Sequence, residues 1–131
     1  MTEQRPLMPA SWGEVIDRKT ILEIKVERLQ SPVSVKHASR ELEALRASLD
    51  GITPTPEALS RLEAALRDVN RQLWDIEDAI RRKEADNSFD TEFIELARSI
   101  YRTNDERHRL KREISVLLQS DFIDEKQYTP Y

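Results

Sequence analysis

Polar and cationic side chains crowd the centre of the stretch SIYRTNDERHRLKREI, residues 99–114. Arg107, His108 and Lys111 are residue types that hold anionic groups through charge and donated hydrogen bonds. The stretch has the pattern of a helix, yet Arg107 falls where the neighbouring apolar residues predict a core position. Because an unpaired buried guanidinium would be strongly destabilising, we predict that Arg107 pairs with a carboxylate or an amide.

The partners of Arg107 follow from the expected pairing of two long helices. An antiparallel hairpin that turns near residues 88 and 89 pairs positions whose numbers sum to about 177. This register places Arg107 opposite Asn70 and Asn104 opposite Leu73. The predicted partners of Arg107 are Asn70, Glu77, Asp17 and Glu23. The predicted ligand or partner patch comprises Asn70, Trp74, Glu77, Tyr101, Asn104, Arg107, His108 and Lys111.

Three interpretations of this patch stay open. The polar residues can fix the register of the hairpin, as a buried asparagine does in coiled coils. They can instead form a pocket where a ligand or a partner helix docks. In the third interpretation the helix is rotated, and the patch is a solvent-exposed face.

Other chemistry finds little support in the sequence. Asp105 and His108 have the i, i+3 spacing of helical-bundle metal sites, but those sites need a second such pair, and His37 has no acidic residue at the matching offset. The chain has no cysteine, no glycine-rich phosphate loop and no G-x-S-x-G motif. We therefore predict no metal, no cofactor and no catalytic residue, and we interpret His108 as a surface histidine.

The composition predicts that helices position the patch. Of the 131 residues, 35% are charged and 38% hydrophobic, which is typical of amphipathic helices, and two glycines leave few places for tight β-turns. The length suits a single domain, residues 1–131. We predict an all-α fold, an antiparallel hairpin of two long helices with two shorter N-terminal helices packed on it.

Capping residues and prolines set the predicted boundaries. Ser11 and Glu14 have the capping-box spacing, Pro32 ends the first helix, Gly51 closes the second and Thr55 caps the third. The predicted segments are an N-terminal extension at 1–10, helices at 12–30, 35–49, 56–85 and 91–119, and a C-terminal tail at 120–131.

The two long helices carry apolar seams with heptad spacing. The first seam is Leu59, Leu62, Leu66, Val69, Leu73, Ile76 and Ile80. The second is Phe93, Leu96, Ile100, Thr103, Arg107, Leu110, Ile114 and Leu117. Asp90 is predicted to cap the later helix, with Phe89 and Ile94 in contact across its start. The helix at 12–30 is apolar on two sides and should have partners on both.

Charge and hydropathy restrict the partners. The net charge is −4 and both signs are mixed along the chain, so nucleic acid is not an expected partner. No apolar run approaches the length of a membrane span, and residues 1–10 lack the apolar core of a signal peptide. We therefore expect a cytoplasmic protein, and surplus apolar surface on the hairpin predicts a possible homodimer.

Three blocks resemble a known family. SWGEVIDRKTILEIKVERL, LWDIEDAIRRKE and FIELARSIYRTNDERHRLKREI occur in the order found in a family of small bacterial proteins classed as a domain of unknown function. The resemblance spans nearly the whole chain except residues 31–57. It brings no catalytic residues, and it implies an accessory role linked to cell-surface polysaccharide biosynthesis.

The stretch EVIDRKTILEIKVERL also resembles the first helix of helical chorismate mutases. Those enzymes hold a dicarboxylate with arginines and lysines inside a helical dimer, and the resemblance implies Arg107, Lys111 and Lys19 as the cations here. The rest of that family's pattern is missing from this sequence.

Two functions are weighed from these observations. The first is a non-enzymatic helical interaction or accessory protein that presents the patch around Trp74, Tyr101 and Arg107 to a protein partner. The alternative is a small-ligand-binding or catalytic bundle in which Arg107, Lys111 and His108 hold an anionic group.

Overall fold

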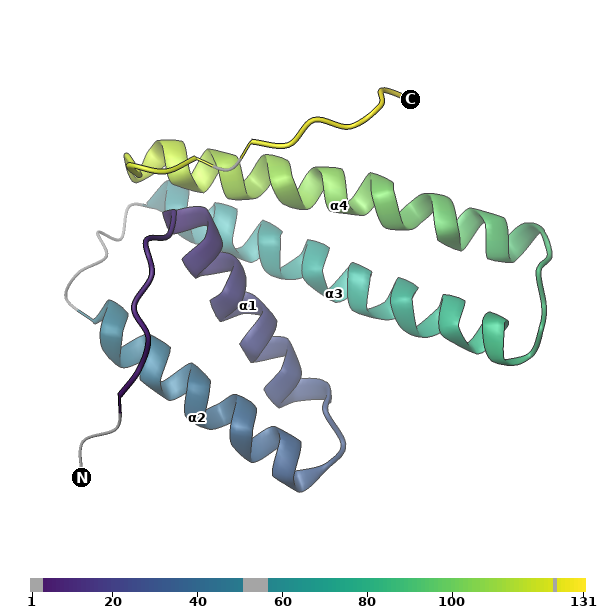
Figure 1. Ribbon diagram of the computed structural model, residues 1–131, viewed down its shortest axis with the longest axis horizontal. Helices are drawn as coiled ribbons and strands as arrows, with labels where there is room; N and C mark the ends of the chain where they lie inside the picture. The colour runs from purple at the N-terminus through teal and green to yellow at the C-terminus, as the bar shows by residue number, and fades with distance from the viewer. Residues whose placement is uncertain (1–3, 51–56, 124) are drawn as a thin grey trace.

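The computed structural model describes residues 4–50, 57–123 and 125–131. Within these ranges the chain forms four helices and no strand (Figure 1). They are α1 (Trp12–Arg28), α2 (Pro32–Leu49), α3 (Glu57–Ala85) and α4 (Thr91–Leu117). The predicted all-α class is confirmed, and α3 and α4 form the long antiparallel hairpin that their seams indicated (Figure 1).

The two pairs of consecutive helices splay apart from a shared end. α1 begins beside the start of α3 and the end of α4, and then diverges from the long hairpin (Figure 1). α2 runs back along α1 in the opposite direction. α1 contacts all three other helices, as its two apolar sides predicted, whereas α2 contacts α1 alone among the described helices. Of the two shorter helices, therefore, only α1 packs directly on the hairpin.

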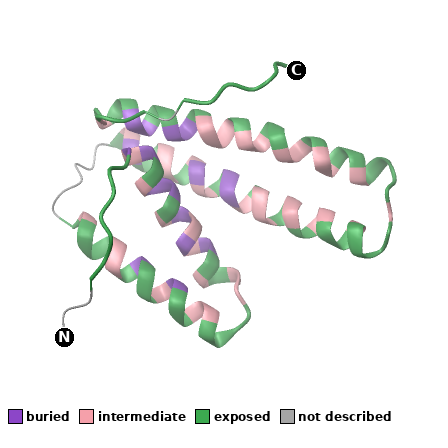
Figure 2. Cartoon of the chain, in the orientation of Figure 1, coloured by how far each residue is buried: buried purple, intermediate pink, exposed green. Residues whose placement is uncertain are grey.

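The core is small and lies where α1 crosses the hairpin. It consists of Ile16, Leu59, Leu66, Val69, Leu110 and Ile114. No described residue between Arg71 and Arg109 is fully buried, so the half of the hairpin that carries the α3–α4 turn contributes none of this core (Figure 2). The accessible surface of 9476 Å² is well above the roughly 7,100 Å² expected for a compact monomer of 15.3 kDa. The molecule is accordingly elongated.

Side chains of α4 and the tail hold the start of α1. The Ser11 hydroxyl accepts a hydrogen bond from the Glu14 N–H (3.1 Å), which confirms the serine half of the predicted capping box. The Trp12 N–H donates to Ser120 Oγ (2.8 Å) and the Gly13 N–H donates to Ser115 Oγ (2.9 Å). The first amides of α1, which no helical carbonyl can satisfy, are thus anchored to the end of α4.

The predicted boundaries differ from the structure at three helices, α1, α2 and α4. α1 ends at Arg28, and Pro32 is the first residue of α2, not the terminator of α1. Proline is favoured at this first helical position because its missing N–H has no helical partner there, and Ser31 caps the helix. α4 ends at Leu117 instead of residue 119. The predicted roles of residues 51 and 55 lie outside the described residues.

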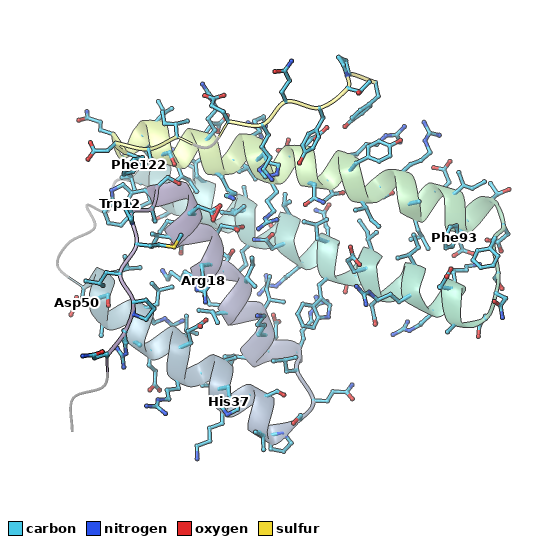
Figure 3. The ribbon with its side chains drawn as sticks, in the orientation of Figure 1. Trp12, Arg18, His37, Asp50, Phe93 and Phe122 are labelled. Atoms are coloured by element: carbon cyan, nitrogen blue, oxygen red, sulfur yellow. The ribbon has the colours of Figure 1, made fainter. Side chains whose placement is uncertain are left out.

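The start of α4 is capped as predicted, but its aromatic contact is different. Asp90 accepts a hydrogen bond from the Phe93 N–H (3.0 Å). The Phe89 ring lies edge-on against Phe93, which is near the turn between α3 and α4 (Figure 3), with centroids 5.2 Å apart, whereas Ile94 is exposed. The predicted contact between Phe89 and Ile94 is therefore wrong, and Phe93 makes the contact instead. Phe93 is a seam residue and is half-buried, whereas Ile94 lies outside the seam.

An ion-pair ladder fixes how α1 lies along α3. Lys19 pairs with Glu63 (3.2 Å), Glu23 with Arg67 (3.1 Å) and Glu27 with Arg71 (3.3 Å). Each pair joins residues 44 positions apart in the chain. Because the steps along both helices are equal and in the same sense, the ladder shows that α1 and α3 run in the same direction where they cross.

Gln119 closes α4 in a conformation that favours glycine. Its φ is 54°, and the Ser120 N–H donates to the Ser115 carbonyl (2.9 Å), as in a Schellman turn. Relief of about 1–2 kcal/mol of steric cost should exceed the entropic cost of glycine, so we expect Gln119→Gly to raise the free energy of unfolding by about 0.5 kcal/mol. Chemical denaturation measures this change in the free energy of unfolding.

The matched control for this substitution is Gln72→Gly, at an exposed position inside α3. There the same change should lower the free energy of unfolding by about 1 kcal/mol, since glycine disfavours a helix interior. Equal losses at positions 119 and 72 would contradict the strain argument.

Candidate functional site

The Arg107 side chain is paired with Asp17, one of its predicted partners. Arg107 Nε donates to Asp17 Oδ1 (3.0 Å) and Arg107 Nη2 to Asp17 Oδ2 (2.5 Å), which is the two-pronged geometry of a strong guanidinium–carboxylate pair. Asp17 is buried on α1, and Arg107 retains 25% of its side-chain exposure. The polar break in the α4 seam is therefore a bridge from α4 to α1.

Asn70 joins the bridge from α3. Its Nδ2 donates to Asp17 Oδ1 (3.0 Å) and to Thr20 Oγ1 (2.9 Å), and the Thr20 hydroxyl donates to the Asp17 carbonyl (2.8 Å). One carboxylate thus links three helices. We call Asp17, Thr20, Asn70 and Arg107 the polar bridge.

The polar bridge is satisfied in its hydrogen bonding. Among the described residues, no fully buried side-chain nitrogen or oxygen lacks a hydrogen-bond partner. The hydrogen bonds that Arg107 donates to Asp17 raise the pKa of its guanidinium, so the charge is held firmly in place. This arrangement agrees with a role in fixing how the helices pair, and it commits the Nε and Nη2 donors of the guanidinium to Asp17.

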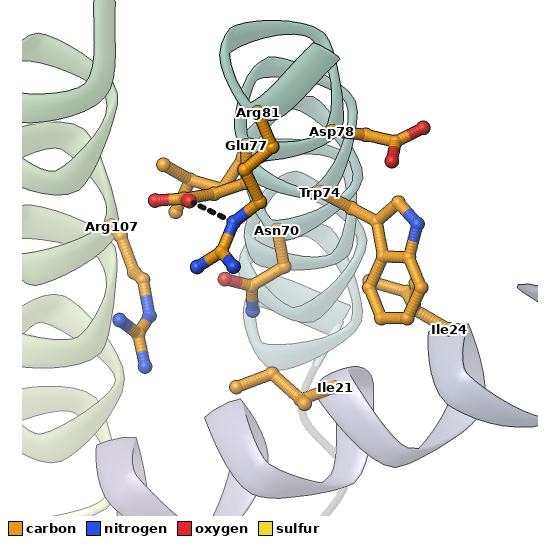
Figure 4. Close-up of a pocket in the computed structure, with 9 residues that line it drawn as sticks. Ile21, Ile24, Asn70, Trp74, Glu77, Asp78, Arg81 and Arg107 are labelled. Atoms are coloured by element: carbon orange, nitrogen blue, oxygen red, sulfur yellow. Dashed lines mark hydrogen bonds and ion pairs between the residues drawn. The ribbon is translucent and has the colours of Figure 1, made fainter. Parts of the chain in front are cut away.

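On one side of Arg107 lies a groove between α1 and α3, at the point where the two hairpins diverge (Figure 4). Its volume is about 530 Å³. We call it the α1–α3 groove; it is lined by Ile21, Ile24, Asn70, Leu73, Trp74, Glu77, Asp78, Arg81 and Arg107. The Trp74 indole and the two isoleucines form an apolar wall, while Glu77 and Arg81 pair with each other (3.4 Å) on the rim (Figure 4).

A second cavity, of about 670 Å³, lies between α4 and the C-terminal tail. We call it the α4–tail cavity; it is lined by Ile100, Tyr101, Asn104, Asp105, Arg107, His108, Lys126, Tyr128, Thr129 and Tyr131. The tail returns along α4 (Figure 1), where the Tyr131 hydroxyl donates to Asp105 and its ring lies edge-on to Tyr101, with centroids 5.0 Å apart. The tail is thus tied to α4.

The structure divides the predicted patch between these two cavities. Asn70, Trp74 and Glu77 line the α1–α3 groove, Tyr101, Asn104 and His108 line the α4–tail cavity, and Arg107 reaches both. Lys111 is buried and pairs with Glu14. Sequence reasoning missed Ile21 and Ile24 of the groove, and Lys126, Tyr128 and Tyr131 of the cavity; the aperiodic tail gave no signal for the last three.

The three cations suggested by the chorismate mutase resemblance do not converge. Lys19 pairs with Glu63 on α3, and Lys111 and Arg107 pair with separate carboxylates of α1, Glu14 and Asp17. Each positive charge is compensated inside the fold, so the described part of the chain assembles no cationic cage for a dicarboxylate from these residues.

His108 is half-buried, not the surface histidine that the sequence indicated. Burial, followed by the positive charges of Lys126, Lys111 and Arg107, lowers its pKa below the ordinary 6.5, and Asp17 opposes the shift. Since the unfolded chain then takes up the proton first, stability that is present above about pH 6.5 is lost as the pH falls through the lower folded pKa.

We expect His108→Gln to flatten the fall in unfolding free energy between neutral and mildly acidic pH. Chemical denaturation at a series of pH values measures the slope. His37→Gln, which removes an exposed histidine of α2, controls for the loss of a histidine as such. An unchanged slope in His108→Gln would contradict the lowered pKa.

The described residues contain neither a membrane-spanning helix nor a cluster of metal-binding side chains. None of their helices combines the length and the apolar character needed to cross a membrane. In the same residues, no three or more histidine, aspartate or glutamate side chains are grouped so that they could hold a metal ion.

These features define an elongated all-helical protein in which two splayed hairpins are joined by a three-helix polar bridge. The chain belongs to the family of unknown function DUF6165, whose model matches residues 8–131. Neither the curated proteins nor the solved structures include a significant match to the chain.

Proposed function

We propose that this chain is a non-enzymatic helical interaction protein whose α1–α3 groove receives an apolar segment of a protein partner. The groove itself carries the proposal. It joins the indole of Trp74 with Ile21 and Ile24 in one wall and has charged side chains on its rim (Figure 4). An aromatic anchor inside an apolar groove with a polar rim is the usual anatomy of a protein interface.

The long hairpin supports the same function. Its seam residues beyond the groove, from Ile76 to Ile100, are only half-buried, because α1 and α2 cover neither face of that part. Helices depend mainly on tertiary packing for their stability, so an uncovered two-helix segment benefits from a partner. The hairpin offers that partner a surface continuous with the groove.

An amphipathic helix fits this surface best. The rim residues Glu77 and Arg81 pair with each other, and Asp78 of the rim pairs with the neighbouring Arg82 (2.6 Å), so the rim carries both signs of charge. Balanced charge at the rim favours an occupant that buries apolar residues and carries charges on its flanks.

The polar bridge favours this function over anion binding by the three predicted cations. Arg107 and Lys111 already pair with Asp17 and Glu14. Removing either cation from its carboxylate would leave a buried charge without compensation, which is strongly unfavourable.

Site-specific photocrosslinking in the native host tests the proposal. A benzophenone side chain is placed at Asp78, on the rim of the groove, and in a matched variant at Glu43, an exposed position of α2. The expected result is a discrete crosslinked partner from position 78 and none from position 43. A second copy of the chain would identify the homodimer, whereas identical products from both positions would overturn the proposal.

A further inference from the structure

Five polar side chains of the α4–tail cavity have no partner within the described part of the chain, and three of them, Lys126, Tyr128 and Thr129, are exposed. Asn104, His108, Lys126, Tyr128 and Thr129 all line it. In the described parts of the chain, none of these five forms a side-chain hydrogen bond or an ion pair. The residues of the polar bridge, a few positions away, are in contrast hydrogen-bonded to one another. The cavity therefore holds donors and acceptors that folding has not used.

The cavity also gathers the aromatic side chains needed to hold a ring. All three tyrosines of the chain, Tyr101, Tyr128 and Tyr131, line it, together with Ile100. Tyr101 and Tyr131 are already arranged edge to face. Aromatic rings separated in this way offer both faces and edges to a further planar group.

One cation of the cavity lining has no ion-pair partner. The charged lining is Arg107 and Lys126 on the positive side and Asp105 on the negative side. Asp17 of α1 compensates Arg107, and the Asp105 carboxylate accepts the Tyr131 hydroxyl. Among the described residues Lys126 remains without an ion-pair partner, and the imidazole of His108 lines the same space.

We propose that the α4–tail cavity binds a small ligand that joins an aromatic ring to an anionic group such as a phosphate. Lys126 and His108 hold the anion, Asn104 and Thr129 supply hydrogen bonds, and the exposed tyrosine rings contact the ring of the ligand. The volume of about 670 Å³ suits a ligand of this size. The inference is independent of the α1–α3 groove.

Binding at this cavity must depend on pH. An anion beside the imidazole favours its protonated form, so the ligand raises the pKa of His108 and binds more tightly as the pH falls. Arg107 and Lys111 of α4 and Lys126 of the tail oppose that protonation, while Asp17 of α1 favours it. The opposing lysine and arginine charges explain why the protonated form needs an anion.

The probe is phenyl phosphate, with inorganic phosphate and phenol as its two halves, and the readout is the NMR signal of the histidine rings. The chain has two histidines, and His37, exposed on α2, is the internal control. We expect saturable shifts of His108 with phenyl phosphate below about 10 mM, weaker binding of either half, and no shift of His37. Because the phosphate itself takes up a proton near pH 6, the pH series runs from about pH 7.5 to about pH 6.5, and affinity should rise over that range.

Two matched variants make the test specific. Lys126→Gln should weaken phenyl phosphate about fivefold or more, whereas Lys36→Gln, an equally exposed lysine on α2, should leave the affinity unchanged. Both are surface changes that the fold tolerates. Absence of a saturable His108 shift, equal shifts of the two histidines, or an affinity that Lys126→Gln does not alter would each overturn the proposal. Photocrosslinking from Asp78 is unaffected by Lys126→Gln, so the two proposals fail separately.

Discussion

Replacing Asp17 by alanine is expected to lower the free energy of unfolding by about 3 kcal/mol, because the Arg107 guanidinium then loses its only buried counter-charge among the described residues. Asn70 loses one of its two acceptors at the same time. Arg107 keeps 25% of its side-chain exposure, so water takes over part of the lost interaction and the cost stays near the lower end for a broken buried pair.

A double-mutant cycle isolates the pair. Asp17→Ala combined with Arg107→Met removes both charges, and the double variant should be about 1–3 kcal/mol more stable than the sum of the two single losses predicts. Glu41→Ala breaks the exposed Arg18–Glu41 pair and should cost less than about 1 kcal/mol. If Asp17→Ala costs no more than Glu41→Ala in chemical denaturation, the polar bridge does not hold the helices together.

The polar bridge also connects stability with the proposed function. α1 supplies Ile21 and Ile24 to the apolar wall of the α1–α3 groove, and Asp17 attaches α1 to both long helices. Loosening that attachment lets the two isoleucines move relative to Trp74 of α3. Crosslinking from Asp78 should therefore weaken in Asp17→Ala even at temperatures where the variant is folded.

Periodicity made the long hairpin predictable. Heptad seams in both helices require a facing partner, and their reflection about the turn brought Arg107 to the level of Asn70, as the shared Asp17 carboxylate now shows. The same reasoning proposed Asp17 among four possible partners. It could not choose among them, because the position of α1 on the hairpin depends on packing and not on any local pattern.

Neither cavity could be predicted from the sequence, and the reason differs between the two. The α1–α3 groove exists because α1 diverges from α3 after the polar bridge, and divergence of two helices leaves no trace in the period of either one. The α4–tail cavity depends on Tyr131 reaching Asp105, a contact between an aperiodic tail and a helix. Both cases involve tertiary geometry that single-element patterns do not encode.

The start of α1 shows the same limit at atomic scale. A serine–glutamate capping box predicted that Glu14 would turn back to its own helix end, but its carboxylate pairs with Lys111 of α4. The amides of Trp12 and Gly13 are bound instead by serines of α4 and the tail. The capping pattern predicted the correct N-cap residue of α1, Ser11. Which groups accept hydrogen bonds from the first amides of the helix depends instead on tertiary contacts with Ser115 and Ser120.

Gly13 is the point on which the contact between α1 and α4 depends most. A Cβ atom added there would overlap the Lys111 carbonyl oxygen and lie 2.8 Å from both the Lys111 carbonyl carbon and Ser115 Oγ. Backbone atoms cannot rotate away as a flexible side chain can. Gly13→Ala must therefore push the two helices apart, and the hydrogen bond between the Gly13 N–H and Ser115 weakens with the separation.

We expect Gly13→Ala to lower the free energy of unfolding by about 3 kcal/mol, combining overpacking with loss of the hydrogen bond. The sign is informative, since alanine would otherwise stabilise a helix relative to glycine by up to about 1 kcal/mol. Ser115→Ala removes the hydroxyl alone and should cost about 1–2 kcal/mol. Because the closest obstacle is the Lys111 backbone, Ser115→Ala should not rescue Gly13→Ala; a rescued double variant, or a stabilised Gly13→Ala, would contradict the close approach of these helices.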